Sequence, residues 1–169
     1  MKQNHTKKLA IAAVFVAIAV VGSTLSFPIF GSKCAPVQHM VNVLSAIFLG
    51  PWWALSAAFC ASLLRNLMGL GTILAFPGSM CGAFLSGILY KYTRKLMGAY
   101  VGEVFGTAVI GGMLAYPIAS LILGNSAAAL FTFVVPFLIS TAGGTIVAAV
   151  ITIALKKSRF IDKMNRELN

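Results

Sequence analysis

Residues 96–155 read LMGAYVGEVFGTAVIGGMLAYPIASLILGNSAAALFTFVVPFLISTAGGTIVAAVITIAL and carry one charged side chain, Glu103. A helix crosses the hydrocarbon core of a membrane with about 20 apolar residues, each adding ~1.5 Å. This stretch is therefore long enough for two membrane-spanning helices. Its apolar residues are continuous and do not alternate with polar ones, which favours helices over a transmembrane β-barrel.

Three further runs have the same character: residues 9–32 and 66–90 carry no charge, and residues 34–64 carry none apart from His39. Apolar residues make up 59% of the chain and charged residues 9%, whereas a soluble domain carries roughly 25% charged residues. A fold of this size leaves much of its surface exposed, so it cannot hide so many apolar side chains. The sequence predicts an all-α integral membrane protein with one membrane domain over residues 1–169.

The basic residues decide the number of spans. If the helix breaks at Gly50–Pro51, where proline disrupts helical hydrogen bonding, there are six spans. Eleven of the 13 Lys and Arg residues then lie on one side, leaving Lys33 and Arg65 on the other. One unbroken helix would give five spans and a split of four against nine. Cytoplasmic loops collect Lys and Arg, so we expect six spans with both termini in the cytoplasm. They cover about 9–30, 37–50, 52–68, 75–92, 97–123 and 131–155.

Several function classes are excluded by the residues themselves. The net charge of +10 comes from residues at the ends of apolar runs, and no basic face with interleaved aromatics suits nucleic acid. No glycine-rich ATP-binding loop appears. Cys34, Cys60 and Cys81 lack metal-site spacing. With no paired carboxylates and no Ser/His/Asp arrangement, the sequence predicts neither an enzyme, nor a bound metal, nor a cofactor.

Polar residues inside the apolar runs are the candidate ligand contacts, because polar groups in lipid are costly. Gln38, His39 and Asn42 lie at the outer end of the second span, where their side chains could bind a small polar ligand. They could instead cap the helix and meet interfacial water. Arg65 and Asn66 end the third span. Arg65 must reach water, a carboxylate or a ligand, or extend to the outer interface.

The fifth span carries two more candidates. Glu103 lies about two turns from the cytoplasmic end, where an acid is a functional candidate by default, although it could form a structural hydrogen bond. Tyr116, before the helix-kinking Pro117, could point its hydroxyl into the bundle. In the first span, Ala13 and Ala17 form a smooth strip for another helix, either within the monomer or in a partner subunit.

The chain resembles the ThiW family of substrate-binding S-components of energy-coupling factor (ECF) vitamin importers. The resemblance covers nearly the whole chain, and its central block is the most specific part. It rests on Pro36–Leu44 (PVQHMVNVL), Leu49–Trp52 (LGPW), Ser62–Leu67 (SLLRNL), Gly69–Gly71, Ala75–Met80 (AFPGSM), Gly102–Thr107 (GEVFGT) and Ala115–Pro117 (AYP).

The resemblance implies a six-helix bundle in the plasma membrane of a prokaryote, which binds the thiamine precursor hydroxyethylthiazole near the external face. It implies association with a transmembrane T-subunit and two cytoplasmic ATPases, and it places T-subunit docking at Ala13 and Ala17. S-components are thought to topple in the membrane to carry their ligand inward. Two alternatives stay open: an S-component for thiamine or another vitamin, and a structural membrane protein without transport function.

Overall fold

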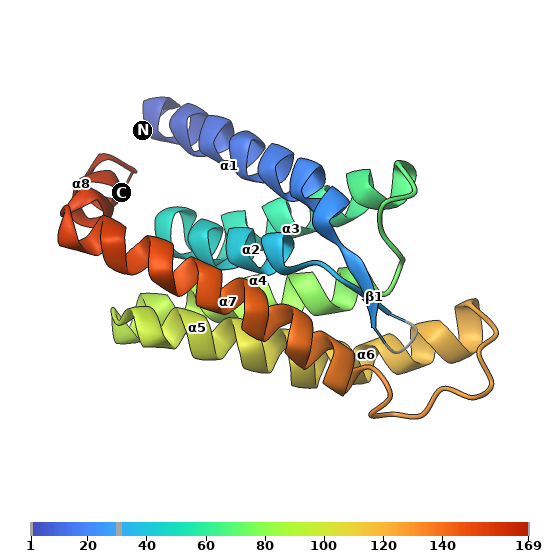
Figure 1. Cartoon of the computed structure of the whole chain (residues 1–169). Helices are drawn as coiled ribbons and strands as arrows, with labels where there is room; N and C mark the ends of the chain where they lie inside the picture. The colour runs from blue at the N-terminus through green and yellow to red at the C-terminus, as the bar shows by residue number, and fades with distance from the viewer. Residues whose placement is uncertain (1, 30–31, 169) are drawn as a thin grey trace.

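The computed structural model describes residues 2–29 and 32–168, which form a helical bundle with one short β-hairpin (Figure 1). The fold class is all-α, as predicted. The first half of the chain contains α1 (Lys2–Gly22), η1 (Ser23–Leu25), β1 (Phe27–Ile29), β2 (Ser32–Cys34), α2 (Pro36–Leu49), α3 (Pro51–Leu67) and α4 (Ala75–Thr93). The second half contains α5 (Leu96–Phe105), η2 (Gly106–Gly111), α6 (Gly112–Pro117), η3 (Ile118–Ile122), α7 (Val134–Lys157) and α8 (Phe160–Leu168).

Different elements lie at the two ends of the bundle. Both chain termini and α8 lie at one end, and the β-hairpin and the loop before α7 lie at the other (Figure 1). Among the described residues, three helices are long and apolar enough to cross a membrane: Asn4–Leu25, Leu96–Ile122 and Val134–Lys157. Large apolar side chains such as Leu121 and Val21 are exposed on the outside, as expected for a surface that faces lipid.

The first predicted span, over 9–30, differs from the structure. Helix α1 begins at Lys2 and ends at Gly22, and strand β1 then pairs antiparallel with β2. Pro28 explains the change, because proline lacks an N–H and biases the residue before it towards extended backbone. The uncharged run continued past the helix because the hairpin is also largely apolar. The predicted end of the span, Phe30, lies outside the described residues.

The predicted break between the second and third spans is present. Helix α2 ends at Leu49 and α3 begins with Pro51 at its first position. Gly50 between them has a φ of +86°, a conformation that glycine adopts without a steric penalty. Pro51 packs directly on α4, where a Cβ added to Gly87 would lie 2.5 Å from Pro51 Cα.

The apolar core fills the end of the bundle that carries the termini. It contains Phe48 and Leu49 of α2, Tyr100 of α5, and Ile161 and Leu168 of α8. The Tyr100 hydroxyl lies 2.6 Å from Thr152 Oγ1, which satisfies two polar groups inside this core. The other end of the bundle contains a smaller apolar cluster around Phe133 and Phe137 and, beside it, the candidate site with its polar side chains.

Candidate ligand-binding pocket

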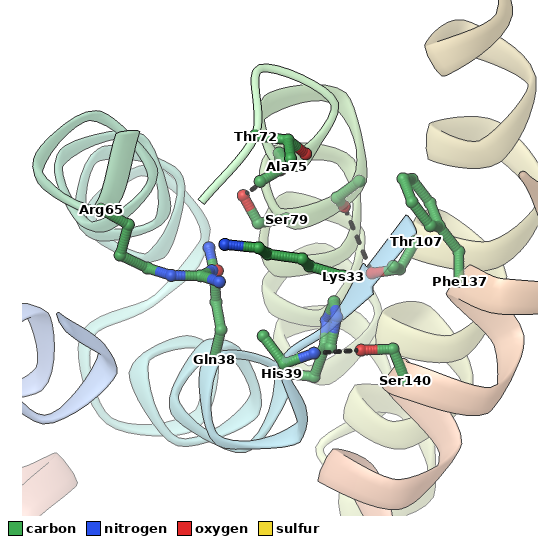
Figure 2. A pocket seen from close by; sticks show the side chains of 12 residues that line it. Lys33, Gln38, His39, Arg65, Thr72, Ala75, Ser79, Thr107, Phe137 and Ser140 are labelled. Carbon is green, nitrogen blue, oxygen red and sulfur yellow. Dashed lines mark hydrogen bonds between the residues drawn. The ribbon is translucent and has the colours of Figure 1, made fainter. Parts of the chain in front are cut away.

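A pocket opens at the hairpin end of the bundle, between α2, α3, α4, η2 and α7 (Figure 2). Counted with its open mouth the hollow measures about 400 Å³, but the space left between the side chains is about 30 Å³. The smaller volume is the relevant one for a bound molecule, and it holds about one water. The lining residues are Lys33, Ala35, Gln38, His39, Arg65, Thr72, Ala75, Gly78, Ser79, Thr107, Phe137 and Ser140.

One wall of the pocket is a chain of hydrogen bonds. Gln38 Nε2 donates to Ser62 Oγ at 2.9 Å, Ser62 Oγ lies 2.8 Å from Ser79 Oγ, and Ser79 Oγ is 2.8 Å from the carbonyl of Ala75. These contacts join α2, α3 and α4 and fix the orientation of the Gln38 amide. A wall whose polar groups are already held in place is suited to selective binding.

Beneath the pocket, Glu103 is fully buried and acts as a hydrogen-bond hub. Its Oε1 atom lies 2.8 Å from His39 Nδ1, 3.0 Å from Asn42 Nδ2 and 3.1 Å from Thr107 Oγ1. Because an ionised carboxylate can only accept hydrogen bonds, His39 carries its proton on Nδ1 when Glu103 is charged. The other ring nitrogen, Nε2, is then the one that can accept a hydrogen bond from a ligand.

Arg65 lines the opposite side of the pocket and is 2% exposed. Its Nε atom has no hydrogen-bond partner among the described residues. The backbone around it is well held, since its carbonyl accepts hydrogen bonds from the amides of Leu70 (2.8 Å) and Gly71 (3.0 Å). The guanidinium is therefore presented to the pocket by a fixed turn at the end of α3.

Lys33 extends from β2 across the pocket (Figure 2). Its Nζ atom lies 3.5 Å from the carbonyl oxygen of Gly69, which connects the hairpin to the turn after α3. A ligand larger than a water molecule therefore needs the Lys33 side chain to move, which a long side chain on an exposed hairpin can do.

The family of the chain is shown by sequence comparison. A family model described as "Thiamine-precursor transporter protein (ThiW)" matches residues 9–158. The chain belongs to the ThiW family. Neither a curated protein nor a solved structure matches it. ThiW proteins are membrane transporters of a thiamine precursor and not enzymes, so the prediction that the chain is a transporter and not an enzyme is confirmed.

The structure places the predicted site residues of this ThiW-family chain in three settings: in the pocket lining, in the hydrogen-bond network beneath it, and away from the pocket. Gln38, His39 and Arg65 line the pocket. Asn42 and Glu103 lie in the hydrogen-bond network around His39, so they act on the pocket through its lining. Contact of any of them with a ligand stays a prediction.

Two predicted contacts lie away from the pocket lining. Asn66 Nδ2 donates to the carbonyls of Ser62 (2.8 Å) and Thr72 (3.1 Å), which holds the turn after α3 in place. Tyr116 is half-buried on α6 and is not among the lining residues. Its π-helical surroundings, η2 before and η3 after, shift the face that Tyr116 presents relative to a regular helix.

Some lining residues were missed by sequence reasoning, and several of them had a signal. Thr107 follows Glu103 by four residues, so the two share a helix face. Ser79 and Ser140 are polar residues in apolar runs, the same signal that selected Gln38 and Asn42. Lys33 is one of the two basic residues at the sparsely charged end. Phe137 carried no signal, because apolar residues dominate α7.

Ala13 and Ala17 are exposed on α1, whereas Ala12 and Ala19 of the same helix are buried against the bundle. The predicted docking strip therefore points outward, away from the monomer core. The described residues contain no group of three or more His, Cys, Asp or Glu side chains that could hold a metal ion.

Proposed function

We propose that the protein is the S-component of an ECF-type importer, which captures hydroxyethylthiazole at the external face of the membrane. It would deliver this ligand through a T-subunit powered by two separate ATPases. The observation that carries the proposal is the pocket itself, which is built from side chains of five helical segments and opens at one end of the bundle.

The orientation follows from charge. Six basic residues lie at the end of the bundle with the termini (Figure 1). Lys91 is in the last turn of α4, Lys156 and Lys157 are in the last turn of α7, and Arg94, Lys95 and Arg159 are in the connections that follow these two helices. The positive-inside tendency makes this end cytoplasmic. The pocket then faces outward, and the six helical passes α1, α2, α3, α4, α5–η3 and α7 each cross or enter the bilayer. Helix α2, with 14 residues, is short for a span and relies on its neighbours.

The chemistry of the lining suits a small heteroaromatic ligand. Phe137 offers an apolar face for a ring. His39 Nε2 can accept a hydrogen bond from a ligand hydroxyl, and the Gln38 amide N–H that Ser62 does not use can donate one to a ring nitrogen. Ligand pockets typically combine apolar walls with a few fixed polar groups in this way.

Titration of the purified protein with hydroxyethylthiazole, thiamine and other vitamins tests the proposal. We expect hydroxyethylthiazole to bind, and Gln38→Ala to weaken binding about tenfold, the effect of one lost hydrogen bond of about 1.4 kcal/mol. Tyr116→Phe is the matched control and should bind normally, because Tyr116 lies off the pocket.

Other results of the same titration separate the alternatives. Tight binding of thiamine or another vitamin, with none of hydroxyethylthiazole, would refute the ligand and keep the S-component class. Failure of a tagged chain to co-purify with a T-subunit or an ATPase from its native membrane would refute the ECF assignment.

A further inference from the structure

Arg65 presents a charge that the protein does not balance. Its side chain is 2% exposed, and its Nε atom has no hydrogen-bond partner among the described residues. Arginine stays charged in proteins, and a buried charge without a partner is strongly unfavourable. Something that enters the pocket is therefore expected to compensate it.

The chain has no spare carboxylate for this task. It contains three acidic residues. Asp162 and Glu167 are on α8, at the other end of the bundle (Figure 1). Glu103 Oε1 faces His39, Asn42 and Thr107. Its Oε2 has no hydrogen-bond partner among the described residues, but it lies against Gly82, and Glu103 does not line the pocket.

A second cation adds to the imbalance. Lys33 reaches into the same pocket from the hairpin (Figure 2), and its Nζ atom makes a long contact, 3.5 Å, with the carbonyl oxygen of Gly69. The pocket thus brings together a lysine and an arginine and has no acidic residue in its lining. A neutral alcohol would leave the buried charge of Arg65 uncompensated.

We propose that the pocket selects a thiamine precursor that carries an oxyanion, a phosphate ester or a carboxylate, which Arg65 and Lys33 bind. The planar fork of arginine matches the paired oxygens of either group, and Lys33 supplies a mobile point charge. Gln38 lies in the same lining and offers a further donor, because Ser62 uses only one of its two amide N–H groups. This inference rests on the proposed function and refines its ligand: the pocket binds the neutral alcohol, and it binds an acidic relative of the same ring more tightly.

Three ligands with the same thiazole ring test the charge preference: hydroxyethylthiazole, its phosphate ester, and the analogue with an acetic acid side chain. We expect at least one of the two anions to bind ten or more times more tightly than the alcohol, and the tighter one identifies the oxyanion. Arg65→Gln should remove the preference, and Arg65→Lys should keep part of it. Equal or tighter binding of the alcohol by the wild type would overturn the proposal.

Lys33→Gln is a second variant that tests the site without the risk of misfolding that a change at buried Arg65 carries. Lys33 is exposed on the hairpin, so its replacement should leave the bundle intact. We expect this variant to retain the wild-type melting temperature and to lose several-fold in affinity for the anions relative to its affinity for the alcohol. An unchanged affinity for the anions in Lys33→Gln would remove Lys33 from the site.

Inorganic phosphate separates this inference from the proposed function. At matched ionic strength, phosphate should raise the melting temperature of the wild type above its value in chloride and should not do so for Arg65→Gln. If no thiazole binds but this difference is seen, the thiazole assignment fails and the anion site stands. If phosphate has no effect and no thiazole anion is preferred, the anion site is refuted.

Discussion

Glu103 holds together three parts of the bundle through one oxygen atom. Oε1 is within hydrogen-bond distance of His39 and Asn42 on α2 and of Thr107 on η2, and Asn42 Nδ2 also reaches the carbonyl of Ser79 on α4 at 3.2 Å. Buried polar networks are favourable when their members are paired. Glu103 therefore acts on the pocket by fixing His39 and Thr107 in its floor.

Replacement of Glu103 tests this role. Glu103→Ala leaves His39 Nδ1 without its acceptor and removes one of the two acceptors of Asn42 Nδ2 and of Thr107 Oγ1. We expect a loss of about 3–5 kcal/mol in the free energy of unfolding, as for other broken buried pairs. For a chain of this size this corresponds to a fall in melting temperature of roughly 10 °C in detergent. Glu103→Gln keeps an acceptor oxygen and should lose less than half as much. Equal losses in both variants would show that the charge, and not the hydrogen-bond geometry, is what matters.

At the scale of single residues, the contacts could be predicted from the sequence but their pairing could not. Gln38, His39 and Arg65 were predicted as contacts because polar groups are rare in apolar runs, and all three line the pocket. The pairing of His39 with Glu103 was not predictable, because the two residues are 64 positions apart. It depends on how closely α2, α4 and α5 pack, which residue spacing within one helix does not determine.

Among the elements, α4 and the α5–η2 segment approach each other closely through small residues. A Cβ added at Gly106 would lie 2.7 Å from the carbonyl oxygen of Cys81, and one added at Gly111 would lie 2.5 Å from Gly78 Cα. Small residues at such positions allow helix backbones to meet. This close approach brings the carbonyl of Gly78 to 3.2 Å from Thr107 Oγ1 and so shapes the pocket floor.

A methyl group at Gly82 should disturb the close contact between α4 and the α5–η2 segment. Its Cβ would lie 2.8 Å from Glu103 Oε2 and would also overlap Thr107 Oγ1. We expect Gly82→Ala to cost about 1–3 kcal/mol of stability, as overpacking does, and to weaken ligand binding by displacing Thr107. Gly143→Ala on α7 is the control, since its Cβ would meet its nearest neighbour at 3.9 Å. Thermal melts and ligand titrations of both variants check the prediction, and equal behaviour would contradict it.

The outward strip on α1 gives a prediction about partners. Leucine at both Ala13 and Ala17 should abolish uptake and co-purification of the T-subunit while ligand binding stays intact, because both positions are exposed and lie on α1, away from the pocket. Val101→Phe is a suitable control: Val101 is 53% exposed and lies on α5, across the bundle from α1 (Figure 1). Loss of ligand binding in the leucine variant would refute the docking role.

At the scale of the whole molecule, most of the helical layout could be predicted from charge and apolar runs. The break at Gly50–Pro51 and the position of α4 follow the sequence closely. The hairpin after α1 and the π-helical segments η2 and η3 could not be predicted. Apolar residues suit the hairpin as well as a helix, and a π-helical turn differs from an α-helical one by a single residue in its hydrogen-bond register.

The orientation in the membrane can be tested by cysteine labelling. In a variant with Cys34, Cys60 and Cys81 replaced by alanine, single cysteines are placed at Asn125, before α7, and at Ser158, after it; both positions are exposed. A membrane-impermeant maleimide should label Asn125→Cys in intact cells and Ser158→Cys only after permeabilisation. The reverse pattern would place the pocket on the cytoplasmic side, and labelling of both in intact cells would contradict the six-pass layout.

The apolar core between the pocket and α8 limits what the chain can do alone. The side chains that pack together there are Phe48, Leu49, Tyr100 and Ile161. In the described part of the chain the pocket is therefore closed at its inner end and does not continue as a channel. In sealed vesicles without partners, the protein should retain ligand up to one molecule per correctly oriented copy and then saturate. Under the proposed function, repeated turnover would require the pocket to open towards the other compartment, and a partner subunit would drive that change.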